Sequence, residues 1–310
     1  MTVPPPAPTS CVKVTPECHV ENTLYGYYPS VGANGFFAAF FCLCLLVQIG
    51  FGIRYRTWTY MIALSLGCFG ELLGYIGRLM LYNNPFNDNG FIIQICCLII
   101  SPAFVSGGIY LTLKHIVLSF GEEWSRLRPS WYTAIFITCD IFSLVLQGAG
   151  GGIASTADPE SNMLDVGTNL MIAGVIFQVV VLIVFGYFLI EYFVRTYRRR
   201  SQLSASAYHL AQSRPFRMFI VAVSVAFLAV FVRCVYRIPE LSNGWRSEIM
   251  RNEGEFIALE GVMIVIAVAV LTIFHPGYCF PALANTIGSQ KADPEKSIRS
   301  NNSAIPMHRF

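Results

Sequence analysis

The sequence predicts an all-α membrane protein, a bundle of seven transmembrane helices with its N-terminus outside and its C-terminus in the cytoplasm. Of the 310 residues, 55% are hydrophobic and 13% are charged, which excludes an ordinary soluble domain. Seven apolar segments each approach or exceed the roughly 20 residues that cross a bilayer as a helix. The positive charges between these segments are distributed very unevenly, and this sets the orientation.

The apolar segments define the expected domains. They fall at about 32–53, 58–82, 91–114, 131–153, 167–193, 216–238 and 254–275. Residues 1–31 should form an extracellular segment, residues 32–277 the seven-helix transmembrane domain, and residues 278–310 a cytoplasmic tail expected to be disordered. The first apolar run is too long for the core of a signal peptide, so we interpret it as a spanning helix.

Cationic residues separate into two sets when loops are assigned alternately to the two sides. One set of fifteen falls on a single side: Arg54, Arg56, Lys114, Arg126, Arg128, Arg195, Arg198, Arg199, Arg200, Arg214, Arg217, Lys291, Lys296, Arg299 and Arg309. The other side has three: Lys13, Arg246 and Arg251. The excess of Lys and Arg marks the cytoplasmic side.

The N-terminal segment carries two cysteines, Cys11 and Cys18. Placed outside, in an oxidising environment, they could close a small disulfide loop, and two free thiols are the alternative.

The second apolar segment holds Glu71, Tyr75 and Arg78 on one helical face. Gly67, Gly70, Gly74 and Gly77 form a stripe of small residues in the same segment, and this favours close approach of another helix. A carboxylate and a guanidinium are costly in hydrocarbon unless they meet partners or water. They therefore indicate an inward-facing helix, with the charges serving either as a structural ion pair or as ligand contacts.

The third and fourth segments carry further signals. Pro102 predicts a kink, which would either border a cavity or serve packing only. In the fourth segment Asp140, Ser143 and Gln147 share one face. The run 148–152 resembles a phosphate-binding loop only in its glycine content, and we interpret it as close helix packing that leads into a loop.

The sixth and seventh segments add the largest set of charges. Arg233, Tyr236, Arg237 and Glu240 lie on one face of the sixth, and Glu253 and Glu260, seven residues apart, are aligned in the seventh.

Helical rise gives the depth of these groups. From the inner ends, Glu71 lies about 20 Å up, Gln147 about 24 Å and Arg233 about 26 Å. Residues of both signs at one level predict a paired network that lines a cavity in the outer half of the membrane.

Two interpretations of these charges stay open. Arg78, Arg233 and Arg237 could hold an anionic head group while Asp140 or Glu260 meets an amine, or the charges could only pair with each other.

These residues give the sequence a resemblance to the fungal lipid-translocating exporters, the RTA-like seven-helix proteins. The resemblance covers about residues 25–280. It rests on these positions: Tyr25-Gly26-Tyr27, Pro29-Ser30, Glu71, Gly74-Tyr75, Gly77-Arg78, Pro102-Ala103, Tyr110, Asp140, Ser143, Gln147, Gly150-Gly151-Gly152, Gly174, Gln178, Arg233, Tyr236-Arg237, Glu240, Glu253 and His275-Pro276-Gly277.

Three positions depart from the family pattern. Ile257 and Glu260 stand where the family usually has Tyr and Asp, and His115 stands where a basic residue is frequent. A longer carboxylate at Glu260 keeps the charge but changes its reach.

The resemblance implies movement or sensing of sphingoid bases and other amphiphiles, and resistance to membrane-active compounds. The favoured function is translocation of lipid amphiphiles, sphingoid-base-like or phospholipid, at the plasma membrane or, alternatively, an endomembrane. The alternative is a lipid-sensing seven-helix receptor that signals through a cytoplasmic partner at Arg195–Arg200 and the C-terminal tail.

Other classes of function are disfavoured. The sequence has no nucleotide-binding motif, so ATP cannot drive the protein directly. It has no HExxH or nucleophile motif, and its five histidines lie outside the apolar segments or near their inner edge. We expect no enzyme activity, catalytic residue, cofactor, metal or nucleic-acid partner.

Overall fold

The computed structural model describes residues 11–279 apart from 12, 17, 24, 121–128, 157–160, 199–207, 209–211 and 244–247. The predicted cytoplasmic tail beyond Cys279, and Arg199 and Arg200 of the basic segment, lie outside the described residues.

Seven helices within the described ranges are long and apolar enough to cross a membrane. Six are continuous: α1 (Val31–Tyr55), α2 (Trp58–Asn83), α3 (Asp88–Phe120), α4 (Pro129–Thr156), α5 (Asn162–Arg198) and α7 (Arg214–Ser242). The seventh span is built from α9 (Glu253–Glu255), the π-helix η4 (Phe256–Val262) and α10 (Met263–Ile273). Three short helices flank the spans: η1 (Val20–Asn22), α8 (Glu248–Arg251) and α11 (Pro276–Cys279). The predicted all-α seven-helix fold is confirmed.

Helix ends follow local chemistry. The Ser30 hydroxyl caps α1 by accepting a hydrogen bond from the Ala33 backbone N–H. Arg56 ends α1 in the left-handed region, with φ 57°. α3 and α5 run well past the predicted limits, because their polar ends continue as helix beyond the apolar stretch that marks a span.

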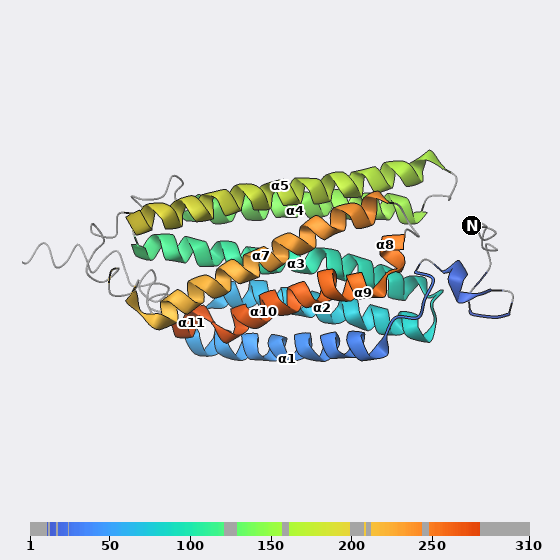
Figure 1. Cartoon of the computed structure of the whole chain (residues 1–310), viewed down its shortest axis with the longest axis horizontal. Helices are drawn as coiled ribbons and strands as arrows, with labels where there is room; N and C mark the ends of the chain where they lie inside the picture. Colours follow the sequence, from blue (N-terminus) through green and yellow to red (C-terminus); the bar gives the residue numbers. More distant parts are fainter. Residues whose placement is uncertain are drawn as a thin grey trace, which may run out of the picture.

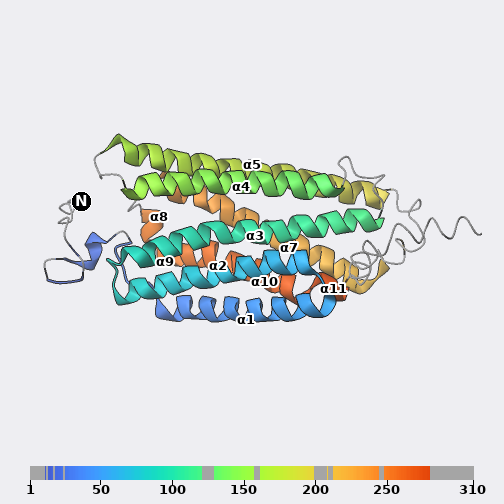
Figure 2. The ribbon, with the colours of Figure 1, turned by 180° about the vertical axis from the view of Figure 1, so that it is seen from behind.

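The bundle is elongated, with all spans running along its long axis (Figure 1). α4 and α5 lie together at one edge and α1 at the opposite edge, with α2, α3, α7 and α10 between them (Figures 1 and 2). η1 and α8 lie at one end of the bundle and α11 lies at the other (Figure 1).

The glycine stripe of α2 packs against α3, as predicted. A Cβ at Gly77 would lie 2.7 Å from the Gly90 carbonyl oxygen and 2.8 Å from the Gln94 backbone nitrogen. A Cβ at Gly74 would lie 2.5 Å from the Leu98 side chain. The two helices therefore approach to backbone contact where Gly77 meets Gly90 and Gln94.

The glycine run of α4 behaves differently from the prediction. Gly150 packs against α5, where its Cβ would meet the Gly167 carbonyl oxygen at 2.6 Å, but Gly148 faces open space. α4 also continues as helix to Thr156, so no loop begins within the run. Helix geometry explains the difference, because successive glycines point to different sides and only some can face the neighbour.

Candidate functional site

The polar residues predicted to face inward are almost all buried. Twelve of them are buried in the bundle: Glu71, Tyr75, Arg78, Asp140, Ser143, Gln147, Gln178, Arg233, Tyr236, Arg237, Glu240 and Glu260. Glu253 is partly exposed, with 24% of its side chain accessible. Isolated charges at this depth would be expensive, so their partners decide what the site can do.

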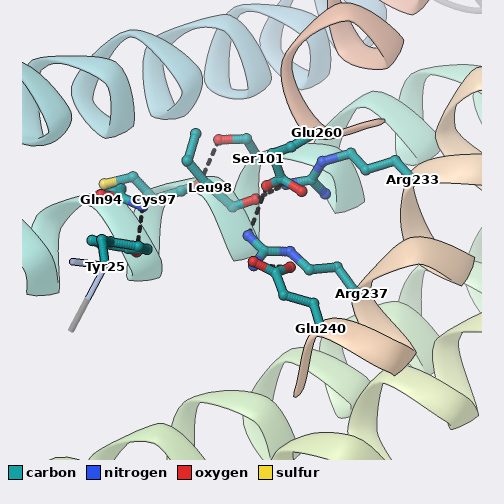
Figure 3. Close-up of polar contacts among 9 residues, drawn as sticks. All are labelled: Tyr25, Gln94, Cys97, Leu98, Ser101, Arg233, Arg237, Glu240 and Glu260. Carbon is teal, nitrogen blue, oxygen red and sulfur yellow. Dashed lines mark hydrogen bonds and ion pairs between the residues drawn. The ribbon is translucent and has the colours of Figure 1, made fainter. Parts of the chain in front are cut away.

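Two arginines of α7 converge on one carboxylate of η4 (Figure 3). Nη2 of Arg233 lies 2.5 Å from Oε1 of Glu260, and Nη2 of Arg237 lies 2.6 Å from the same oxygen. Nη1 of Arg237 also donates to Oε2 of Glu240 at 2.9 Å. Arg233, Tyr236, Arg237 and Glu240 of α7 are all buried, as their predicted spacing on one helical face requires.

The backbone of α3 supplies a further acceptor. Nη2 of Arg233 donates to the carbonyl of Leu98 (Figure 3). In a regular helix that carbonyl would accept from the N–H four residues later, which here is Pro102, and proline has no N–H. Pro102 therefore leaves a buried acceptor unmatched, and Arg233 satisfies it.

The π-helix determines where Glu260 points. Glu253 and Glu260 were expected on one face, but they contact different arginines, Arg78 and Arg233. A π-helix turns less per residue than an α-helix, so the seven-residue spacing no longer aligns the two side chains. Gly261 allows this turn to pack closely, because a Cβ there would lie 2.6 Å from the Phe37 ring and 3.0 Å from the Tyr75 hydroxyl.

Arg78 is the centre of a second cluster, at the end of the bundle where η1 lies. Its guanidinium donates to the Tyr27 hydroxyl at 3.0 Å, lies 3.6 Å from Glu253, and stacks 3.9 Å above the Phe256 ring centre. Glu253 in turn accepts a 2.6 Å hydrogen bond from the Ser30 backbone N–H. The N-terminal segment is thereby fastened to the seventh span.

Tyr25 ties the same segment to α3. Nε2 of Gln94 donates to the Tyr25 hydroxyl at 2.7 Å (Figure 3). Burial raises the pKa of the Tyr25 phenol above its usual value, although nearby Arg78 opposes the shift, so the hydroxyl stays neutral. Upstream, a disulfide joins Cys11 and Cys18.

Glu71 faces the α7 cluster from α2, near Arg233, Arg237 and Glu260. Its Oε1 has no hydrogen-bond partner among the described residues. Glu71 therefore adds a carboxyl group beside arginines that already pair with other carboxylates.

The α4 and α5 residues lie apart from both arginine clusters. Nε2 of Gln147 donates to Oε1 of Gln178 at 3.1 Å, and the Ser143 hydroxyl donates to the Asp140 carbonyl at 2.7 Å. The sequence had predicted one paired network that includes Asp140, Gln147 and the arginines, with Gln147 near the depth of Arg233 and Asp140 lower. The structure divides them instead, because helix depth alone does not fix which neighbour a face meets.

Sequence reasoning did not select Tyr25, Tyr27, Gln94, the Leu98 carbonyl or Phe256 as site residues. A lone glutamine in an apolar span was a usable signal for Gln94. The two tyrosines precede the first span, and only folding brings them to Arg78 of α2 and Gln94 of α3. Within the described ranges, His, Cys, Asp and Glu form no group of three or more that could hold a metal ion.

Each arginine of the site already has a carboxylate: Arg78 has Glu253, Arg233 has Glu260, and Arg237 has Glu240 and Glu260. Displacing one of these carboxylates to bind an anion would be unfavourable. Nε and Nη1 of Arg78, and Nε of both Arg233 and Arg237, have no hydrogen-bond partner among the described residues. The arrangement is thus suited to joining the α7 face, the seventh span and the N-terminal segment.

Comparison with known proteins places these features in a family. The family model described as "RTA1 like protein" matches residues 64–283. The sphingoid long-chain base transporter RSB1 of Saccharomyces cerevisiae is 31% identical over 297 residues, covering 86% of this chain and 77% of the relative.

Two further yeast relatives are more distant. Protein RTM1 is 26% identical, covering 74% of this chain and 73% of its own. Protoporphyrin uptake protein 1 is 29% identical, covering 67% of each chain. No solved structure matches the chain.

Proposed function

This chain belongs to the RTA1-like family, and from that premise we propose that it translocates lipid amphiphiles, sphingoid-base-like or phospholipid, across a fungal membrane. A relative that is similar over most of the chain is named as a transporter of sphingoid long-chain bases. Another is named for uptake of protoporphyrin, so the relatives' names together describe amphiphiles with polar groups.

The observation that carries the proposal is the set of buried ionisable residues inside the seven-helix bundle. A lipid that changes leaflet must take its polar head across about 30 Å of hydrocarbon. Glu71, Asp140 and Arg233 lie within the spans rather than at their ends. Polar groups at this depth offer the head group contacts that the lipid tails lack.

We further propose a location in the plasma membrane, with an endomembrane as the alternative, and a contribution to resistance against membrane-active compounds. The alternative function is lipid sensing, with the basic segment Arg195–Arg200 and the tail docking a cytoplasmic partner. Both functions need an amphiphile to bind the helix bundle. They differ in whether the amphiphile then crosses the membrane.

Leaflet exchange in liposomes tests the proposal. Purified protein is reconstituted with a fluorescent sphingoid base or phospholipid, and exchange is compared with that of the double variant Arg233→Ala, Glu71→Gln. We expect the wild type to accelerate exchange and the double variant to lose most of it. A charge-matched control, Arg54→Ala with Asp165→Asn, changes exposed residues and should exchange like the wild type.

Folding is checked by size-exclusion profile and thermal unfolding. A wild type that binds lipid saturably without accelerating exchange would support the receptor and contradict translocation.

A further inference from the structure

α3 and α4 enclose a second group of buried polar side chains, outside the arginine clusters. Asp140 of α4 is 3% exposed, while Tyr110 and Ser106 of α3 are 0% and 1% exposed. The Tyr110 hydroxyl lies next to both the Asp140 carboxylate and the Ser106 hydroxyl. Yet both Asp140 oxygens and both hydroxyls lack a hydrogen bond of ordinary geometry to any described residue. Buried polar groups usually have well-formed hydrogen bonds, so these groups are candidates for contact with a ligand.

Open space adjoins these groups. Gly107 is buried, but a Cβ there would meet no atom within 4 Å. Its neighbour Gly108 contrasts with it, since a Cβ there would meet Leu64 at 3.2 Å. Gly107 lies three residues before Tyr110, so both fall on the same face of α3. The space at Gly107 therefore lies on the face of α3 that carries Tyr110.

Charge distinguishes this site from the arginine clusters. The three arginines of those clusters are paired with carboxylates, and no ion pair is recorded for Asp140 among the described residues. Cys234 of α7 lies near Asp140 and also near Arg233 and Glu260. The α3–α4 site thus holds a carboxyl group without a cationic partner, and a cationic head group beside it would favour its charged form.

Aromatic side chains pack around Tyr110. The Tyr110 ring centre lies 4.5 Å from that of Phe185 and 5.5 Å from that of Phe136. Phe136 precedes Asp140 by one helical turn on the same face. An apolar chain attached to a cationic head would meet rings rather than charges.

We propose that Asp140, Tyr110, Ser106 and the space beside Gly107 bind the head group of a primary-amine amphiphile. Asp140 accepts from the ammonium, the two hydroxyls accept or donate around it, and the rings contact the chain. The inference rests on the proposed function and narrows its substrate class to amines rather than phosphates.

Binding of radiolabelled dodecylamine to the purified full-length protein in detergent micelles tests the site. We expect saturable binding by the wild type and at least about a tenfold loss in Asp140→Asn, because a charge-assisted hydrogen bond is lost. Gly107→Leu should lose binding to a similar degree with the carboxylate intact, since it fills the space. The matched controls, Asp165→Asn and Gly148→Leu, change an exposed acid and a glycine that faces open space, and should bind like the wild type.

Thermal unfolding distinguishes a variant that loses binding from one that loses its fold. Asp140→Asn keeps the size of the side chain and removes a carboxyl group without an ion pair, and the Cβ of Gly107→Leu meets no atom within 4 Å, so both should unfold no lower than the wild type. Unlabelled dodecylamine should displace the probe, whereas N-acetyldodecylamine, which has no cationic amine, should not.

Three outcomes would overturn the inference. They are unchanged binding in both α3–α4 variants, displacement by dodecyl phosphate as effective as by dodecylamine, or displacement by the N-acetyl compound as effective as by dodecylamine. The last would assign the binding to the apolar chain rather than to the amine. If the wild type accelerates exchange and Asp140→Asn does so equally, translocation stands and this site fails. If the wild type binds the amine through Asp140 without accelerating exchange, the site stands and translocation fails.

Discussion

Arg233 reaches from α7 to the carbonyl of Leu98 because Pro102, four residues later, has no N–H to offer that carbonyl. A residue usually regarded as a helix breaker therefore provides a hydrogen-bond acceptor inside the bundle. The same guanidinium also pairs with Glu260, so Pro102 helps to fix the geometry of the buried ion pairs.

Replacement of Pro102 tests this role. Pro102→Ala restores an N–H that competes with Arg233 for the Leu98 carbonyl, and it removes a helix-interior proline that costs about 3 kcal/mol in soluble helices. We expect a higher unfolding temperature together with slower leaflet exchange. Ala103→Gly, one residue on, leaves the carbonyl as it is and serves as the control. Faster exchange in Pro102→Ala would contradict the assignment.

His275 predicts a pH dependence of stability. It lies two residues past the seventh span, is 0% exposed, and accepts a hydrogen bond from the Gly277 backbone N–H through Nδ1. Burial lowers the pKa of its imidazole to about 4, from 6.5. Between these values the unfolded chain binds more protons than the folded one, so stability falls as pH falls from about 6.5 to 4, by up to about 3 kcal/mol.

Thermal unfolding from about pH 7 to about pH 4.5 measures this effect. His275→Asn keeps an acceptor for the Gly277 N–H and does not titrate, so its unfolding temperature should fall less over the same range. Identical profiles for the two proteins would assign the pH dependence to other groups.

At the scale of elements, the α2–α3 pair depends on glycine. Gly77 faces backbone atoms of α3, which cannot rotate away as a side chain can. Gly90 of α3 packs equally closely against α2, because a Cβ there would lie 3.1 Å from the Gly77 carbonyl oxygen. This contact sets the distance between the helix that carries Glu71 and Arg78 and the helix that carries Gln94 and Pro102.

Alanine at Gly77 should separate the two helices. We expect Gly77→Ala to destabilise the protein by about 1–3 kcal/mol, the usual cost of overpacking. Gly148→Ala on α4 faces open space and should be neutral or stabilising by up to about 1 kcal/mol, from helix propensity. Unfolding midpoints in detergent compare the two, and equal midpoints would show that α2 and α3 can separate freely.

At the scale of the whole molecule, the fold brings the basic helix ends together. The ends of α1, α3 and α5 and the start of α7 lie at the α11 end of the bundle (Figure 1). They carry Arg54, Lys114, Arg195 and Arg214. The opposite end holds η1 and Arg251. By the positive-inside rule the α11 end should face the cytoplasm.

Glycosylation mapping tests this orientation. An acceptor sequon inserted ahead of Ser30, far enough from the membrane to be reached, should be modified in cells. The native sequon Asn301-Asn302-Ser303, which lies outside the described residues, should stay unmodified. Modification of the native sequon would reverse the predicted topology.

The sequence by itself determined the seven spans, the inward faces of α2, α4 and α7, and the contact stripe on α2. These follow from apolar length and helical period, which are properties of each segment alone. Only the tertiary structure decided the partners. The π-turn redirected Glu260, the missing N–H of Pro102 attracted Arg233, and the N-terminal tyrosines folded over Arg78. It also separated Asp140 from the arginines. Pairing depends on how neighbouring helices are rotated and placed against one another, and that rotation is not encoded in the pattern of any single segment.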